Sequence, residues 1–160
     1  MSTGRVLVVG FGNPDRGDDG LGPLVARRLQ MSAPSGTDVR IRSGDGLALI
    51  EDWRAYGAVV LIDAAQSLGS PGRVHRIDLR REALPAELRP TSTHGFGLAE
   101  AIRLAATLQR LPPILVLYAI EADDFTSGAP ISPAVASAAS EIVQAVLQEA
   151  ESLQRQPIPA

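Results

Sequence analysis

The sequence contains neither cysteine nor lysine among its 160 residues. Without cysteine, the chain cannot form a disulfide bond, bind a metal through thiolates or use a cysteine nucleophile. Without lysine, it cannot form a Schiff base or hold a phosphate through a P-loop lysine. All 15 basic residues are therefore arginines, which we attribute to genomic base composition rather than to function.

Long apolar runs and an excess of positive charge are also lacking. No segment approaches the ~20 apolar residues that cross a bilayer, and the first apolar run stops at Gly10, too early for a signal peptide. The net charge is −3, whereas nucleic-acid-binding domains normally carry a basic patch. We therefore expect a cytoplasmic protein that binds neither nucleic acid nor membranes.

What the sequence does contain is an alternation of apolar runs and helical stripes, which is typical of a parallel sheet wrapped by helices. The segments predicted to be strands of this sheet are 5–10, 38–42, 58–63 and 114–120. Helices are predicted from the apolar spacing that begins at Leu21 and at Leu98, over residues 47–55, and from Pro133 onward. Residues 73–79 mix charged and apolar side chains and are predicted to form a half-exposed, antiparallel edge strand.

These elements predict an α/β fold, a single three-layer α/β/α domain. Its twisted sheet is mostly parallel, with one antiparallel edge strand, and helices cover both faces. With 45% hydrophobic residues, a chain of this length can form one complete core. We assign the domain to residues 1–155 and expect the proline-containing residues 156–160 to fray.

Acidic and imidazole side chains follow the predicted strands at their carboxyl ends, where ligands bind in sheets of this kind. Asp15, Asp18 and Asp19 follow the first strand, Asp63 ends the third, and His94 precedes a helix. Two carboxylates and one imidazole form a plausible ligand set for a divalent ion such as Ni²⁺ or Zn²⁺. The hypothesis is that Asp19, Asp63 and His94 meet in an open metal site.

Each of these residues also has a structural interpretation. Asp18 and Asp19 are favourable helix caps, Asp63 could bind turn amides, and His94 could be an ordinary loop residue. His75 is expected to be solvated in the edge strand. The acidic residues after the last strand are expected to form a hydrated loop: Glu121, Asp123 and Asp124.

Two other classes of function fit the pattern less well. Gly10 and Gly12 could begin a dinucleotide fingerprint, but Asp15 takes the place of its third glycine and the loop's aspartates would repel a pyrophosphate. A receiver-like phosphoacceptor module would also collect Mg²⁺ with acidic residues at this edge. Such a module needs a lysine after its last core strand, and this chain has none.

Several segments, taken in order, resemble the maturation endopeptidases of nickel–iron hydrogenases. They are residues 10–13 (GFGN), 18–22 (DDGLG), 60–64 (VLIDA), 93–98 (THGFGL), 120–121 (IE) and 131–135 (ISPAV). The resemblance implies that Asp19, Asp63 and His94 contact a metal, the first position being Glu or Asp in the family. Residues 43–46 (SGDG) depart from the Gly-Thr loop expected there.

The resemblance also implies an activity. Enzymes of this family remove a short C-terminal extension from the hydrogenase large-subunit precursor after nickel insertion. The nickel would belong to the substrate, so the free enzyme would bind it weakly. We also expect the enzyme to be a monomer. Asp19 and Asp63 are candidates for activating water, as the aspartic-type classification of the family suggests; polarisation by the metal is the alternative. A non-catalytic nickel chaperone with the same three ligands is the main rival function.

Overall fold

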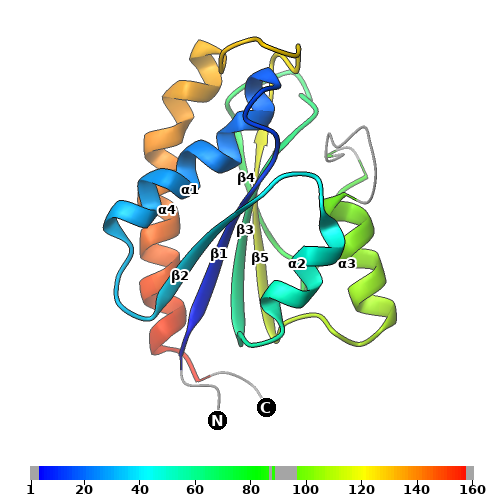
Figure 1. The fold of residues 1–160 in the computed structure, drawn as a ribbon, viewed down its shortest axis with the longest axis vertical. Helices are drawn as coiled ribbons and strands as arrows, with labels where there is room; N and C mark the ends of the chain where they lie inside the picture. The colour runs from blue at the N-terminus through cyan, green and yellow to red at the C-terminus, as the bar shows by residue number, and fades with distance from the viewer. Residues whose placement is uncertain (1–3, 87, 89–96, 158–160) are drawn as a thin grey trace.

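The computed structural model describes residues 4–86, 88 and 97–157, which fold around a five-stranded sheet of order β2-β1-β3-β5-β4. Four strands run parallel and the edge strand β4 is antiparallel to β5. The strands are β1 (Val6–Phe11), β2 (Thr37–Arg42), β3 (Ala58–Ala65), β4 (Val74–Asp78) and β5 (Ile114–Glu121). Both the predicted fold class and the antiparallel edge strand are confirmed (Figure 1).

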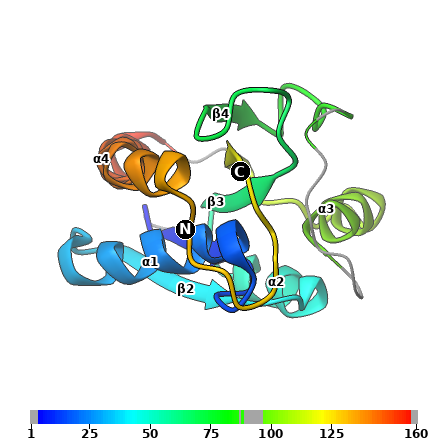
Figure 2. The same ribbon diagram turned by 90° about the horizontal axis from the view of Figure 1, so that it is seen from above.

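The helices form one layer on each face of the sheet. Figure 2 shows α1 (Leu21–Ser32) and α4 (Pro133–Arg155) on one side and α2 (Gly46–Trp53) and α3 (Leu98–Thr107) on the other. Because side chains alternate along a strand, Val6 and Val8 pack into the cluster with α1 and α4, whereas Leu7 and Val9 pack into the cluster with α2 and α3. This double coverage explains why β1 is an unbroken apolar run.

The strand order places the reversal point of the sheet between β1 and β3. From β1 the chain crosses over to β2 on one side and then returns to β3 on the other. In open α/β sheets, this arrangement leaves a crevice beyond the carboxyl ends of the two central strands. The loop after β1, which contains the short 3-10 helix η1 (Gly17–Gly20), borders that crevice. Within the described ranges, no helix combines the length and the apolar character needed to cross a bilayer.

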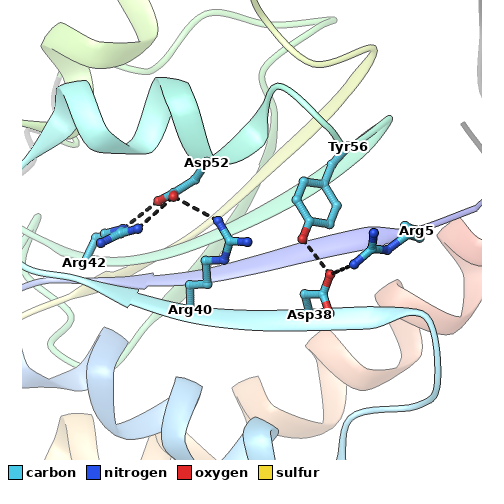
Figure 3. Close-up of polar contacts among 6 residues, drawn as sticks. All are labelled: Arg5, Asp38, Arg40, Arg42, Asp52 and Tyr56. Atoms are coloured by element: carbon cyan, nitrogen blue, oxygen red, sulfur yellow. Dashed lines mark hydrogen bonds and ion pairs between the residues drawn. The ribbon is translucent and has the colours of Figure 1, made fainter.

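A polar network fixes the edge strand β2 to α2 (Figure 3). The buried carboxylate of Asp52 accepts a hydrogen bond from Arg40 (2.9 Å) and a bidentate pair from Arg42 (2.6 and 2.7 Å). Asp38, which lies within β2, accepts hydrogen bonds from Tyr56 and Arg5. The arginines of β2 therefore have a structural role in the described fold.

The prediction of a hydrated loop is wrong at Glu121, which is buried, whereas His75 is partly exposed, with 21% of its side chain accessible. Glu121 is only 1% exposed and accepts hydrogen bonds from His75 Nε2 (2.8 Å) and from the backbone N–H groups of Leu68 (2.6 Å) and Ser70 (3.1 Å). Burial by itself would raise the pKa of Glu121, but these hydrogen bonds outweigh it and hold the pKa below its usual value. Glu121 thus ties the loop after β3 to β4 and β5.

We expect Glu121→Gln to lower the free energy of unfolding at pH 7 by about 1–2 kcal/mol, because a charge-assisted acceptor is replaced by a neutral one. A carboxylate whose pKa is lowered in the folded protein stabilises the fold at pH values above the ordinary glutamate pKa of 4.5. This contribution disappears as the pH falls through the pKa of the folded state. Urea unfolding of both proteins at pH 7 and pH 3.5 should show the gap closing in acid. A gap of constant size would contradict this role for the ionised group.

Candidate functional site

A cleft of about 330 Å³ lies at the carboxyl ends of β1 and β3, the reversal point of the sheet. Asp19 and Asp63 both line it. The remaining walls come from residues 11–16 and from Ser43 and Gly44, which follow β2. Two of the three predicted ligands, from segments far apart in the sequence, therefore share one cleft, and Asp15 adds a third acid to its lining.

Asp19 is held at the end of η1 by the loop that leaves β1. Its residue exposure is 6%, its Oδ2 accepts a hydrogen bond from the backbone N–H of Asn13 (2.9 Å), and Arg16 Nη1 lies 3.9 Å from the same oxygen. The loop turns so tightly that Gly12 has φ +144°, and a Cβ there would lie 2.1 Å from the backbone oxygen of Asp19. The glycine-rich segment thus wraps around Asp19 and its carboxylate.

Asp63 lies within β3 and is 5% exposed. Its Oδ1 accepts a hydrogen bond from the backbone N–H of Ala64 (2.9 Å), which belongs to the same strand, so the interpretation of Asp63 as a binder of turn amides is wrong. Burial, together with the negative charge of Asp19, raises the pKa of Asp63 well above its usual range, and the Ala64 hydrogen bond opposes this only in part. A cation entering the cleft would relieve both the burial cost and the repulsion between the two acids.

The capping interpretation of Asp18 and Asp19 is wrong. Gly20 occupies the N-cap of α1 and makes no side-chain capping bond. Asp19 lines the cleft, whereas Asp18 is fully buried and accepts hydrogen bonds from the loop that follows β5. The two neighbouring aspartates therefore differ in function, which their sequence alone does not show.

The other predicted site features are settled only in part. His94 lies outside the described residues, so the complete Asp19, Asp63 and His94 set remains a prediction. In the part of the chain that the structure describes, no three His, Asp or Glu side chains form a metal-binding group. Asp45, in the departing 43–46 segment, accepts a hydrogen bond from the backbone N–H of Ala48 (3.1 Å) and caps α2.

A second and larger cavity lies apart from these acids. It has a volume of about 690 Å³ and an apolar lining from the chain around Leu84 and from α3. Neither Asp19 nor Asp63 lines it. Among the described residues, the smaller, acidic cleft is the better candidate site, because two predicted ligands and a perturbed pKa coincide there.

Known proteins with similar sequences are linked to hydrogenase maturation. A family model described as hydrogenase maturation protease matches residues 42–149. The hydrogenase expression/formation protein HupD of Thiocapsa roseopersicina is 30% identical over 128 residues, which cover 76% of this chain and 57% of that protein. HupD of Rhodobacter capsulatus is 28% identical over 139 residues, covering 82% and 64%. The chain thus spans about three-fifths of the length of these relatives.

Solved structures share the fold along nearly the whole chain. The NiFe hydrogenase maturation protease HybD from Thermococcus kodakarensis superposes with a TM-score of 0.73 at 26% identity, covering 91% of this chain and 99% of that one. The hydrogenase maturating endopeptidase HybD from E. coli gives a TM-score of 0.78 at 22% identity, covering 92% and 93%. Because the sequence identity to the E. coli protein is only 22%, that similarity is evidence for the fold alone.

Proposed function

As the chain belongs to the hydrogenase maturation protease family, we propose that it is an endopeptidase that removes a C-terminal extension from a nickel-loaded hydrogenase large-subunit precursor. The observation that carries the proposal is the cleft at the sheet reversal point, where Asp19 and Asp63 are buried side by side. We further propose that it acts in the cytoplasm and as a monomer.

Asp19, Asp63 and His94 are proposed to recognise the nickel that the substrate carries. The acidic cleft supports this role, because burial and the neighbouring Asp19 disfavour the ionised form of Asp63 and a cation between the two carboxylates would favour it. Oxygen and imidazole donors suit a divalent transition ion, and three protein ligands leave positions for ligands from the substrate. A precursor without nickel would lack the attraction between the cation and the two carboxylates and would therefore bind less well.

The same two carboxylates are proposed to assist hydrolysis. One of them accepts a proton from the attacking water as the water oxygen bonds to the scissile carbonyl carbon. When the carbon–nitrogen bond then breaks, the departing amine takes up a proton and a new carboxyl end is left on the large subunit. The arrangement of two buried acids in one cleft agrees with the aspartic-type classification of the family.

The test is incubation of the purified chain with large-subunit precursor in nickel-loaded and nickel-free form. We expect a shortened large subunit and a released peptide, both identified by mass spectrometry, from the nickel-loaded form alone. A precursor of unchanged length that still forms a complex would identify a nickel chaperone and refute the peptidase. Equal cleavage of the two forms would refute nickel recognition.

We also expect the isolated chain to bind nickel weakly, with a dissociation constant on the order of micromolar or weaker. The reason is that the proposed site offers three ligands, none of them a thiolate, and an open coordination sphere. Isothermal titration with Ni²⁺ measures this directly. Nanomolar affinity would contradict a substrate-borne metal, since the enzyme would then carry nickel of its own.

A further inference from the structure

Asp18, the residue before Asp19, is a fully buried carboxylate with 0% exposure. Its Oδ2 accepts hydrogen bonds from the backbone N–H groups of Asp123 (2.8 Å) and Asp124 (2.9 Å) and from the hydroxyl of Ser132 (2.9 Å). Its Oδ1 accepts a hydrogen bond from the backbone N–H of Ser132 (2.7 Å). All four donors lie in the loop 122–132 between β5 and α4, more than 100 residues along the chain.

The loop 122–132 and the loop after β1 make further contacts around Asp18. Three of these contacts are the bond from Asp18 N–H to the Asp124 carbonyl (2.8 Å), the bond from Gly128 N–H to the Asp15 carbonyl (2.7 Å), and the placement of the Arg16 guanidinium 5.9 Å from the Phe125 ring centre. At Gly17 the approach is so close that a Cβ would lie 2.3 Å from the Asp124 carbonyl oxygen. The two loops therefore pack as a single unit.

The chemistry of this junction explains why an aspartate stands there. Four donors converge on two oxygen atoms, and an ionised carboxylate is the side chain that accepts them all. In the described ranges no cation forms an ion pair with Asp18, so these charge-assisted bonds compensate its burial. An asparagine would turn an N–H₂ group toward some of the donors and leave them unsatisfied.

We propose that Asp18 is a positioning residue for Asp19. The two residues share a peptide bond, so clamping the Asp18 side chain to loop 122–132 also fixes the backbone from which the Asp19 carboxylate enters the cleft. That carboxylate lines the same cleft as Asp63. The hydrogen bonds to Asp18 hold Asp19 in this position, and a displacement of about 1 Å is enough to cost a site most of its effect.

This inference rests on the proposed function, and its test measures how much nickel improves precursor binding. In Asp18→Asn we expect the affinity ratio of nickel-loaded to nickel-free precursor to fall about tenfold or more, and processing to slow accordingly. Binding of the nickel-free precursor should not change. The matched control is Glu121→Gln, a buried carboxylate with backbone donors at the same sheet edge; it should lose stability and keep the ratio.

A double-mutant cycle separates positioning from general structural damage. In an Asp19→Ala background, Asp18→Asn should still lower the unfolding midpoint but should not reduce the affinity ratio further. An equal loss of the ratio with and without Asp19 would overturn the proposal, as would an unchanged ratio in Asp18→Asn alone. If Asp19→Ala itself keeps the ratio, the proposed nickel recognition fails instead.

A milder variant keeps the test informative if Asp18→Asn does not fold. Ser132→Ala removes one of the four hydrogen bonds to Asp18 and leaves the three backbone donors in place. We expect a folded protein with a smaller fall in the affinity ratio, again absent in the Asp19→Ala background. A folded Ser132→Ala protein with the full ratio would count against the clamp.

Discussion

Asp63→Asn is expected to make the fold more stable while it reduces processing of the precursor on the order of 10² to 10⁴-fold. The wild-type carboxylate is 5% exposed and lies close to the charge of Asp19, both of which disfavour its ionised form. Asparagine has the same shape and can still accept the hydrogen bond from Ala64 N–H. It lacks the charge on which nickel recognition and water activation both depend.

The pH dependence of the Asp63→Asn effect on stability follows from the direction of the pKa shift. An acid whose pKa is raised in the folded protein stabilises the fold at pH values below its ordinary pKa of 3.8. This stabilisation is lost as the pH rises through the pKa of the folded state. The gain in stability of Asp63→Asn should therefore be absent near pH 3.5 and largest at neutral pH. Glu121→Gln should show the opposite sign over the same range, so the two variants control for each other.

Thermal unfolding at several pH values measures this gain, where 1 kcal/mol corresponds to about 2–4 °C in a domain of this size. A lower midpoint for Asp63→Asn at pH 7 would show that the carboxylate is satisfied in the folded protein, contrary to its burial beside Asp19. Normal processing by this variant would remove Asp63 from the site. A variant that is more stable but less active is expected when the replaced group serves function and destabilises the fold.

The fold was largely predictable because its strongest signals are local. The buried strands β3 and β5 are continuous apolar runs, and α4 begins at Pro133 as its sequence indicates. The end of β3 was less predictable: the strand continues to Ala65, two residues past Asp63. A charged residue normally ends a buried run, but Asp63 remains in the strand because the cleft, and not solvent, receives its side chain.

The site was predictable only where topology alone determines it. Asp19 follows β1 and Asp63 lies two residues before the end of β3, and the carboxyl ends of such parallel strands meet at the reversal point. The roles of Asp18 and Glu121 were not predictable, since their donors come from other loops, 105 and 53 residues away in the clearest cases. Such pairings have no periodicity, and a buried, satisfied carboxylate has the same local sequence as a hydrated one.

Asp19→Ala and His94→Ala are each expected to reduce processing on the order of 10² to 10⁴-fold and to leave the precursor bound no better with nickel than without it. Both residues are proposed to bind the same ion, and its coordination geometry is lost when either ligand is removed. For that reason, the double variant should be hardly worse than either single one. Rates of extension release and affinities for the two precursor forms provide the measurements.

The controls for these variants use the other members of the same residue types. The sequence has two histidines, and the other one is His75. It forms a hydrogen bond with Glu121 and does not line the cleft. His75→Ala should therefore lower stability and keep the nickel-dependent gain in precursor affinity, as Glu121→Gln should. Loss of that gain in His75→Ala, or multiplicative losses in the Asp19 and His94 double variant, would mean that these residues do not act together on one ion. The cleft would then recognise the precursor chain itself and not its metal.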